Sequence, residues 1–393
     1  SLHDALPIFS AILAIGLVGF WTLFLNLWKP KKKWPAWVGY IIIIGAWFAA
    51  IRYYILNQVD LYGTMYYPLM NMFRTESYGF LFGVFLAIPV FIILSLLYWT
   101  INKIWSKTPE ENRTGRRAFF RTAATIVPLA TIGGSSYAAF AGQQELVVTH
   151  ESFGYTNLPP GLKNYKIVQL SDIHIGPSID LDDFDEILKL ALLQKPNRVV
   201  ITGDLIDKLA WLPQVCERLT TFAKQIPDGV DFILGNHEYH HDVNKVLDSL
   251  KRNTPMNILV NSNIQIMGGK QPVYIAGVAY DNDREKEKRE AMIDKALSGI
   301  PDYAFVILLA HHPEFFEESI ERKIPLTLSG HTHGGQIVFM GMPLVPTGTP
   351  YTKGRYVEEQ SVCYVNNGTG HWFPIRINCP REITVITFFD GVA

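Results

Sequence analysis

Long apolar runs occupy the first third of the chain, whereas short apolar runs separated by polar loops occupy the rest. Four of the long runs are each close to the ~20 residues that a helix needs to cross the hydrocarbon core of a bilayer. They are Ile8–Trp28, Trp34–Leu56, Tyr78–Ile101 and Ala118–Ala141. We therefore predict a membrane domain over residues 1–142, with about four transmembrane α-helices.

Aromatic and basic residues flank these runs. Trp and Tyr lie near the ends of the first three, as in the aromatic belts at membrane surfaces, whereas the fourth is less apolar and contains Pro128. Basic residues gather after the first run and between the third and fourth, at Lys29, Lys31, Lys32, Lys33, Lys103, Lys107, Arg113, Arg116, Arg117 and Arg121. The positive-inside rule makes these loops cytoplasmic. We therefore predict a multi-pass protein of the cell (inner) membrane whose chain after Gly142 is extracytoplasmic.

A possible export signal lies in the fourth run. Arg116-Arg117 together with the segment Ala139-Phe140-Ala141 resembles a twin-arginine signal with a small-residue cleavage site. Because other runs precede it, we expect an anchor that is retained rather than cleaved. Either outcome agrees with an extracytoplasmic second domain, whereas a further span or strong charges before Ser1 would invert this topology.

From Glu145 onward the pattern changes to short β-rich runs alternating with helical ones. Residues 181–194 place apolar side chains at helical spacing, and Pro213 suits the first turn of another helix. The β-rich runs are Lys166–Leu170, Arg198–Ile201, Val230–Leu234, Val273–Ala276, Ala304–Leu309, Val362–Val365 and Ile383–Phe388. This alternation predicts an α/β sandwich over residues 143–393, with two mixed sheets flanked by helices.

Composition narrows the classes of function. The net charge is −1 and only 18% of residues are charged, so the chain has no basic surplus and we expect no nucleic-acid partner. Three cysteines are too few for a disulfide scaffold or a zinc finger. A Cys363–Cys379 bridge is conceivable in an oxidising compartment, but we favour buried free thiols.

Acidic residues, amides and histidines follow the predicted strands. These loops are Ser171–His174, Gly203–Asp207, Gly235–Glu238, His311–Pro313 and Gly330–Gln336. Open α/β sheets place their ligands at the carboxyl ends of strands. Each short motif alone is common by chance, and a lone histidine is more often structural, but the ordered set after successive strands favours a shared site.

The last of these loops contains His331 and His333, flanked by glycines. Two histidines spaced one apart cannot share a helix face, but an extended loop can direct them to neighbouring sites. Glycine allows sharp turns and close backbone approach, and imidazole is the commonest neutral ligand of Zn, Mn and Fe. The loop therefore indicates a metal site.

Taken together, these motifs resemble the five motifs of the calcineurin-like metallophosphoesterases. They are Asp172-x-His174, Gly203-Asp204, Gly235-Asn236-His237-Glu238, His311 and Gly330-His331-x-His333. The resemblance runs from about Glu145 to the C-terminus. The segments 330–336 and 364–377 are similar to those of a membrane-associated bacterial branch that includes UDP-2,3-diacylglucosamine hydrolases. The sequence departs from the family pattern at Glu238, where many members have Asp, and at Asn366-Asn367. Neither departure changes an implied ligand residue.

The resemblance implies two divalent metal ions. Asp172, His174, Asp204 and His333 would hold the first, and Asp204, Asn236, His311 and His331 the second, so Asp204 would bridge them. Catalysis would involve Asp204, Asn236 and His237, with His237 donating to a phosphoryl oxygen or to the leaving group. The ligand set suits Mn, Zn or Fe equally.

Two residues close in sequence to implied ligands, His312 and Asp207, have no ligand role in this scheme. We expect His311 rather than His312 to be the ligand because it directly follows its strand. The role of His312 stays open, and support of the ligands from outside the ligand set is one alternative. We expect Asp207 to cap or orient its loop.

The function implied is a membrane-anchored, dinuclear, metal-dependent phosphoesterase that hydrolyses a phosphate ester or pyrophosphate bond. The partners expected are membrane lipid and a phosphate-containing small molecule or lipid head group, such as an envelope precursor. A nuclease of the same superfamily is one alternative, which the lack of basic surplus disfavours. A non-enzymatic metal-binding sensor or scaffold is another. A transporter is disfavoured because the apolar runs contain almost no ionisable residue.

Overall fold

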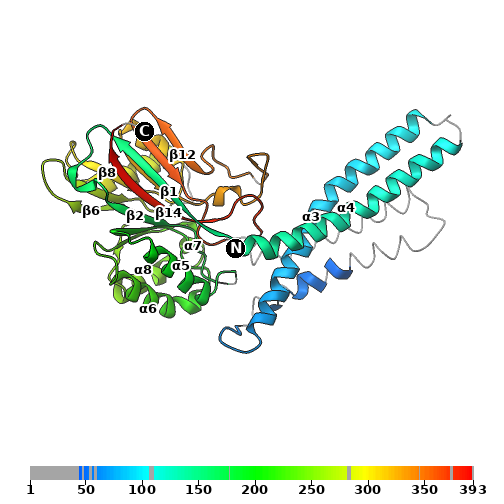
Figure 1. The fold of residues 1–393 in the computed structure, drawn as a ribbon, viewed down its shortest axis with the longest axis horizontal. Coiled ribbons are helices and arrows are strands. Elements are labelled where there is room, and N and C mark those ends of the chain that lie inside the picture. The colour runs from blue at the N-terminus through cyan, green and yellow to red at the C-terminus, as the bar shows by residue number, and fades with distance from the viewer. Residues whose placement is uncertain are drawn as a thin grey trace. The chain divides into compact units, whose positions relative to one another are not determined.

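The computed structural model describes residues 44–46, 48–52, 55–56, 60–105, 110–176, 178–280, 285–344, 346–371 and 375–391. The chain divides into two compact units, Ser1–Gln144 and Glu145–Ala393, which are drawn in Figure 1. The predicted run Ile8–Trp28 and part of Trp34–Leu56 lie outside the described residues.

Two long helices dominate the described part of the first unit, α3 (Tyr67–Ile104) and α4 (Glu110–Gln144). Glycines let them pack closely: a Cβ atom at Gly79 would lie 2.5 Å from Cα of Ser136, and one at Gly83 would contact Cα of Ile132. Residue numbers increase from Gly79 to Gly83 along α3, whereas those of the contacted residues decrease from Ser136 to Ile132 along α4, so the two helices are antiparallel. Small residues four apart are the usual means by which membrane helices approach each other.

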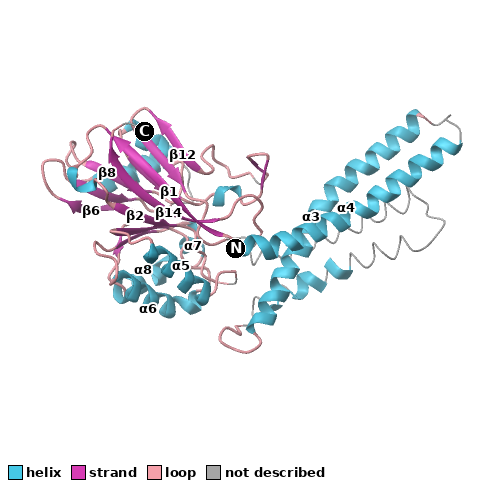
Figure 2. Cartoon of the chain, viewed as in Figure 1, coloured by secondary structure: helices cyan, strands magenta, loops and turns pink. Residues whose placement is uncertain are grey.

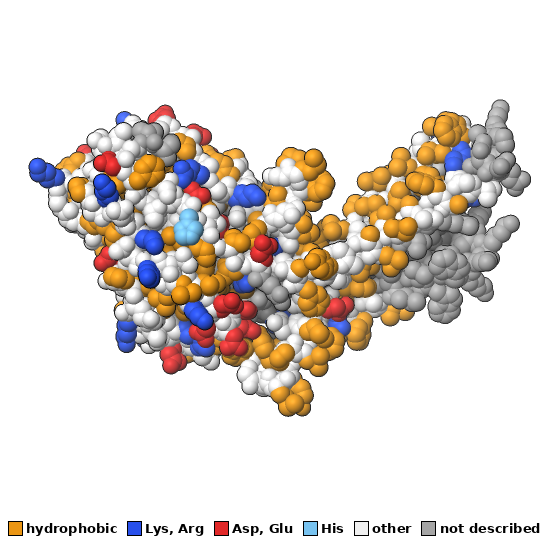
Figure 3. All heavy atoms as spheres, viewed as in Figure 1, with side chains coloured by type: hydrophobic (Ala, Val, Ile, Leu, Met, Phe, Trp, Pro, Cys, Tyr) orange, Lys and Arg blue, Asp and Glu red, His pale blue; other side chains and the backbone are white. Residues whose placement is uncertain are grey.

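Among the described residues, α3 is the one helix long and apolar enough to cross a membrane, on the basis of its length and composition alone. It is 38 residues long, and many of its large apolar side chains are exposed (Figure 3). The fourth predicted run lies within α4, which is not among the candidate spans found in the described residues. The described residues thus contain one candidate span.

The second unit is built on two six-stranded sheets. The first contains, in order, β1 (Leu146–Tyr155), β14 (Arg381–Asp390), β2 (Lys166–Leu170), β3 (Arg198–Thr202), β4 (Val230–Ile233) and β5 (Asn257–Ile258). The second contains β12 (Gly354–Glu358), β13 (Ser361–Val365), β9 (Leu326–Ser329), β8 (Phe305–Leu309), β7 (Val273–Gly277) and β6 (Ser262–Met267). Antiparallel pairs β14–β2, β12–β13 and β6–β7 accompany parallel ones, so both sheets are mixed.

The two sheets face each other across one apolar core. Val200 and Ile233 of the first sheet pack in the same cluster as Ile275, Ile307 and Leu328 of the second, and all five are fully buried. This interdigitation of inner faces defines a sandwich, and burial of apolar area is its main stabilising term.

Helices cover the outer faces. On the side of the first sheet lie α5 (Leu181–Leu193), α6 (Leu212–Ala223) and α8 (Val243–Asn253), grouped below β2 in Figure 2. On the second sheet, Ile293 and Ala296 of α9 (Lys286–Leu297) and Phe315 of α10 (Phe315–Glu321) pack against β7 and β8. The prediction of an α/β sandwich with mixed sheets flanked by helices is confirmed for this unit.

Strands β2, β3, β4, β7, β8 and β13 match their sequence predictions within one residue at each end, and β14 extends two residues beyond its predicted run at each end. The short strands β5, β10 and β11 were not predicted, nor were β1, β6, β9 and β12. All three cysteines are buried free thiols, so the Cys363–Cys379 bridge is not formed.

Candidate metal centre

Every residue of the predicted ligand set follows the carboxyl end of a strand. Asp172 and His174 come after β2, Asp204 after β3, and Asn236 after β4, and these three strands are parallel neighbours. The remaining ligands come after β8 and β9, which are parallel neighbours in the second sheet. Since the sheets are stacked, the five loops converge at one edge of the sandwich.

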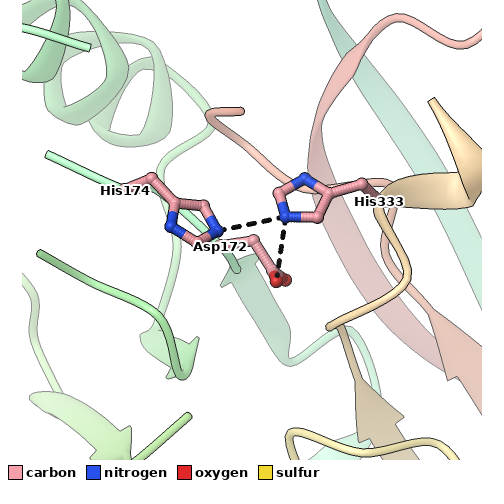
Figure 4. A group of neighbouring side chains, drawn as sticks. All are labelled: Asp172, His174 and His333. Carbon is pink, nitrogen blue, oxygen red and sulfur yellow. Dashed lines mark hydrogen bonds and ion pairs between the residues drawn. The ribbon is translucent and has the colours of Figure 1, made fainter. Parts of the chain in front are cut away.

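Figure 4 shows the first group, in which Asp172, His174 and His333 point toward one another. The two Nε2 atoms of His174 and His333 lie 3.1 Å apart, and His333 Nε2 lies 3.5 Å from Asp172 Oδ1. All three side chains are buried. A carboxylate and two imidazoles converging in this way form a donor set suited to a divalent cation.

The second group surrounds His311. Its Nε2 lies 3.3 Å from Asp204 Oδ2 and 3.1 Å from Asn236 Oδ1, and the same amide oxygen lies 2.9 Å from His331 Nδ1. Asp204 Oδ2 also lies 3.6 Å from His174 Nε2, in the first group. Asp204 therefore contacts both groups, as a bridging carboxylate must.

The backbone at these positions is unusual. Five of the seven predicted ligands have φ between 50° and 70°, in the left-handed region that non-glycine residues seldom adopt: Asp172, His174, Asp204, His331 and His333. Backbone strain of this kind gathers at functional sites, where the surrounding structure holds it. Gly330 is required here too, because a Cβ atom would collide with the Asp172 carboxylate.

Glu238 ties two of the loops together. Its fully buried carboxylate accepts hydrogen bonds from the backbone N–H groups of Asp204 at 3.0 Å, Leu205 at 2.7 Å and Gly235 at 2.7 Å. The N–H of His237 in turn donates to Asp204 Oδ1 at 2.8 Å. Glu238, which departs from the family pattern, therefore binds backbone N–H groups and does not occupy a predicted ligand position.

Asp207 contacts three histidines. Its Oδ1 lies 3.2 Å from His174 Nδ1, 2.7 Å from His237 Nδ1 and 3.6 Å from His241 Nε2. It orients imidazole rings from two loops, which is more than the local role expected for it. Together with His174 and His237, it also forms a group whose atoms are close enough to hold a cation.

The electrostatics of the centre favour positive charge. Burial alone would lower the pKa of His237, but the carboxylates of Asp204 and Asp207 outweigh it and raise that pKa to about 10. Burial would likewise lower the pKa of His311, yet Asp204 and Asp172 raise it to about 9. The carboxylates that attract these protons would attract a divalent cation in the same way.

The tautomers fit ligand roles for two histidines. The Nδ1–H of His311 donates to the carbonyl oxygen of Thr202 at 2.8 Å, and that of His174 donates to Asp207. A hydrogen bond from one ring nitrogen leaves the lone pair of the other free, and metal-binding histidines are held in this manner. The residues present therefore fit divalent cations.

Arg376 was not predicted as part of this site. Its buried guanidinium donates to the carbonyl oxygens of Gly370 at 2.7 Å, Asn367 at 2.9 Å and Cys379 at 3.1 Å, and its Nη2 lies 3.2 Å from His333 Nδ1. It holds a C-terminal loop against a ligand. In the sequence, the one indication of its role is that Arg376 is a charged residue within an otherwise mostly apolar segment.

His312 lies beside the centre, next to a candidate ligand. Its ring centroid is 3.7 Å from that of His331 and 5.1 Å from that of Tyr280, on which it stacks. It therefore packs behind a ligand of the second group.

Comparison with known proteins agrees with these observations. The profile of the calcineurin-like phosphoesterases matches residues 165–335. An uncharacterized metallophosphoesterase of Campylobacter jejuni is 30% identical over 88% of this chain and 87% of its own length. One from Bacillus subtilis is 31% identical over 65% of this chain and 90% of its own. A "transmembrane protein with metallophosphoesterase domain" of Danio rerio is 27% identical over 77% of this chain and 71% of its own.

Proposed function

The chain belongs to the calcineurin-like metallophosphoesterases, which are metal-dependent phosphoester hydrolases, and we propose that it is a membrane-anchored member with two metal ions. Asp172, His174, Asp204 and His333 hold the first ion in this proposal. The second is held by a set that shares the bridging carboxylate: Asp204, Asn236, His311 and His331.

The observation that carries this proposal is the position of Asp204 Oδ2, at 3.6 Å from His174 Nε2 and 3.3 Å from His311 Nε2. A carboxylate shared between two cations offsets their mutual repulsion. When bound, such cations supply Lewis acidity and lower the pKa of water enough for attack on phosphorus.

His237 supplies a proton donor. Asp207 contacts its Nδ1 at 2.7 Å, which leaves Nε2 for the substrate, and the charge of Asp207, which holds no metal in this proposal, raises the pKa of the ring and favours its protonated form. A positioned imidazolium stabilises charge on a phosphoryl oxygen or protonates the leaving group.

We propose a phosphate ester or pyrophosphate in a lipid or envelope precursor as the substrate, acted on at the extracytoplasmic face of the cell membrane. The apolar helix α3 and the relatives named as transmembrane proteins support attachment to a membrane. The basic loops predicted to be cytoplasmic support this orientation.

The test compares hydrolysis of a chromogenic phosphomonoester, a phosphodiester and a UDP-acyl-sugar by purified full-length protein, with Mn added or chelated. Asp204→Asn removes the bridging charge and His237→Ala removes the donor. We expect each to lower kcat/KM by about 100-fold or more. Metal analysis should give two ions per wild-type chain.

Matched controls are Asp302→Asn and His150→Ala, since both wild-type side chains are exposed away from the centre. They should retain wild-type turnover. If fully metallated wild-type protein hydrolyses none of the three substrates, the proposed activity fails, and one bound ion per chain would exclude a dinuclear centre.

A further inference from the structure

We propose that the hairpin formed by β10 (Val338–Phe339) and β11 (Met342–Pro343) inserts into the surface of a lipid bilayer, so that the enzyme selects phosphate groups carried by lipids. This inference rests on the proposed function and names the substrate class of the same site.

The backbone of the hairpin holds its tip outward. Val338 pairs with Pro343 and Phe339 with Met342 in an antiparallel ladder. Met340 and Gly341 form the two-residue turn, with φ of 50° and 83°. Two positive φ values in succession are typical of the tight turns that join twisted strands, so Met340 is fixed at the tip.

Four large apolar side chains of this hairpin face solvent instead of the core. Phe339 is 60% exposed, Met340 82%, Met342 66% and Leu344 61%. In Figure 3, hydrophobic side chains gather where the brown-orange segment of Figure 1 projects beside β12. A contiguous apolar patch of this kind marks a site of interaction with a membrane or another protein.

The charge pattern favours a membrane. Residues 334–352 contain no Asp, Glu, Lys, Arg or His, and Lys353, which is exposed, ends this uncharged stretch. Protein interfaces surround their apolar centre with a polar, solvent-accessible rim, and Arg is enriched in such interfaces. A segment entering a bilayer must instead exclude charge from its buried part, with cations near the head groups.

Covalent attachment points to the same partner. The chain carries the membrane-type helix α3, and a single residue, Glu145, separates α4 from β1. Covalent attachment to a membrane-type helix raises the effective concentration of lipid around the hairpin without any new contact.

The hairpin lies close in sequence to a ligand loop of the metal centre, and backbone hydrogen bonds hold it to neighbouring segments. The N–H of Val338 donates to the carbonyl oxygen of Ile377 at 2.9 Å, and that of Leu344 donates to Ile337 at 2.8 Å. The hairpin follows His333 within five residues and begins just beyond the region that matches the family profile, 165–335. Insertion would thus hold the ligand loop beside the head groups.

The first test measures insertion. Full-length protein in nanodiscs of phosphatidylethanolamine and phosphatidylglycerol carries an NBD fluorophore at Met340→Cys, since the three native cysteines are buried. The control is Tyr303→Cys: Tyr303 is 64% exposed and precedes β8, opposite the carboxyl ends that form the centre. We expect brominated lipids to quench the label at position 340 at least about twofold, and not the control label.

Absence of quenching at position 340 overturns the proposal. A blue-shifted emission that brominated lipid does not quench overturns it too, because the hairpin would then be covered by protein, either a second copy or another part of this chain.

The second test separates substrate classes. Phe339→Asp places a charge on the hairpin and Tyr303→Asp is the matched control. We expect Phe339→Asp to lower turnover of phosphatidic acid or a lipid pyrophosphate in nanodiscs at least about 10-fold, while turnover of the soluble chromogenic ester stays within about twofold. The control should change neither.

The inference is contradicted if Phe339→Asp lowers turnover of the lipid and the soluble substrate equally, or does not lower turnover of the lipid substrate. It is also contradicted if wild-type protein hydrolyses the soluble ester but no lipid phosphate. If wild-type protein hydrolyses nothing, the proposed function fails, whereas the quenching measurement still decides whether the hairpin inserts.

Discussion

At the residue scale, Asp207 couples the two kinds of histidine in the centre. One carboxylate oxygen contacts Nδ1 of His174, a candidate ligand, and Nδ1 of His237, the candidate donor. Burial alone would raise the pKa of Asp207, but the two imidazoles hold it well below its usual range. The charge that fixes both rings is therefore present at every physiological pH.

Replacing this charge should change the pH profile. In Asp207→Asn we expect kcat to fall roughly 10- to 100-fold, because the amide orients the rings less firmly. The pKa of His237, about 10 in the wild type, should fall when one of its raising carboxylates is neutralised. Activity that needs the protonated ring is lost as pH rises through that pKa, so the basic limb should move to lower pH.

Measurement of kcat against pH with a soluble ester tests this, with Asp302→Asn as the control. A basic limb at the wild-type position would contradict the assignment of His237 as the proton donor held by Asp207.

At the element scale, the N-terminus of α5 shows how a cap carries an electrostatic cost. Asp180 Oδ1 accepts from the N–H groups of Asp182 and Asp183, both at 2.9 Å, and Asp183 Oδ2 accepts from the N–H of Asp180 at 3.0 Å. This reciprocal capping satisfies donors that the helix leaves unpaired. Burial, and then the charge of Asp180, raise the pKa of Asp183 to about 6.

A raised pKa of a carboxyl group means that the folded state binds its proton more tightly than the unfolded state. Stability from this group is therefore greatest below pH 4 and declines as pH rises from about 4 to about 6. Asp183→Asn keeps the oxygen acceptor and removes the charge. We expect it to stabilise the second unit above pH 7 by about 1 kcal/mol after solvent screening, or about 2–4 °C in Tm.

Thermal unfolding at pH 4 and pH 7.5 tests this expectation. The two proteins should differ only at the higher pH, and Asp182→Asn, an exposed change in the same turn, should have no such effect. A lower Tm for Asp183→Asn at pH 7.5 would show that the cap needs the charge.

At the scale of the whole molecule, the metal centre joins the two sheets. Asp172 and Asp204 belong to loops of the first sheet, and His311 and His333 to loops of the second. A buried amide already links the sheets nearby, since Gln169 of β2 donates to the carbonyl oxygen of Ser329 in β9 at 2.9 Å. Bound cations would add cross-links between sheets and neutralise their buried carboxylates.

Chelation should therefore destabilise the second unit. A ligand present at 100 times its Kd stabilises by about 2.7 kcal/mol, which corresponds to roughly 5–10 °C in Tm. We expect EDTA to lower Tm by this amount, Mn to restore it in a concentration-dependent manner, and Asp204→Asn to respond less. An unchanged Tm on chelation in wild-type protein would mean that metal does not tie the sheets together.

Sequence alone determined the features that depend on neighbouring residues. Strands such as β2 and β8 are buried on both faces, so they form unbroken apolar runs that were predicted within one residue. The motif residues directly follow those apolar runs in the sequence, so the positions of the candidate ligand loops could be predicted from the positions of the strands. Strand β1 was missed because exposed and polar positions interrupt it, and of the four predicted membrane spans the described residues support α3.

Tertiary structure decided what depends on residues far apart in the chain. Arg376 meets His333 across 43 residues, and Asp207 reaches a second histidine 30 residues away, because sheet packing brings their loops together. The left-handed backbone of the ligands and the exposure of the hairpin are likewise features that the structure shows and the sequence did not predict. Local sequence determines which residues end each strand, whereas the stacking of two sheets decides which of them meet.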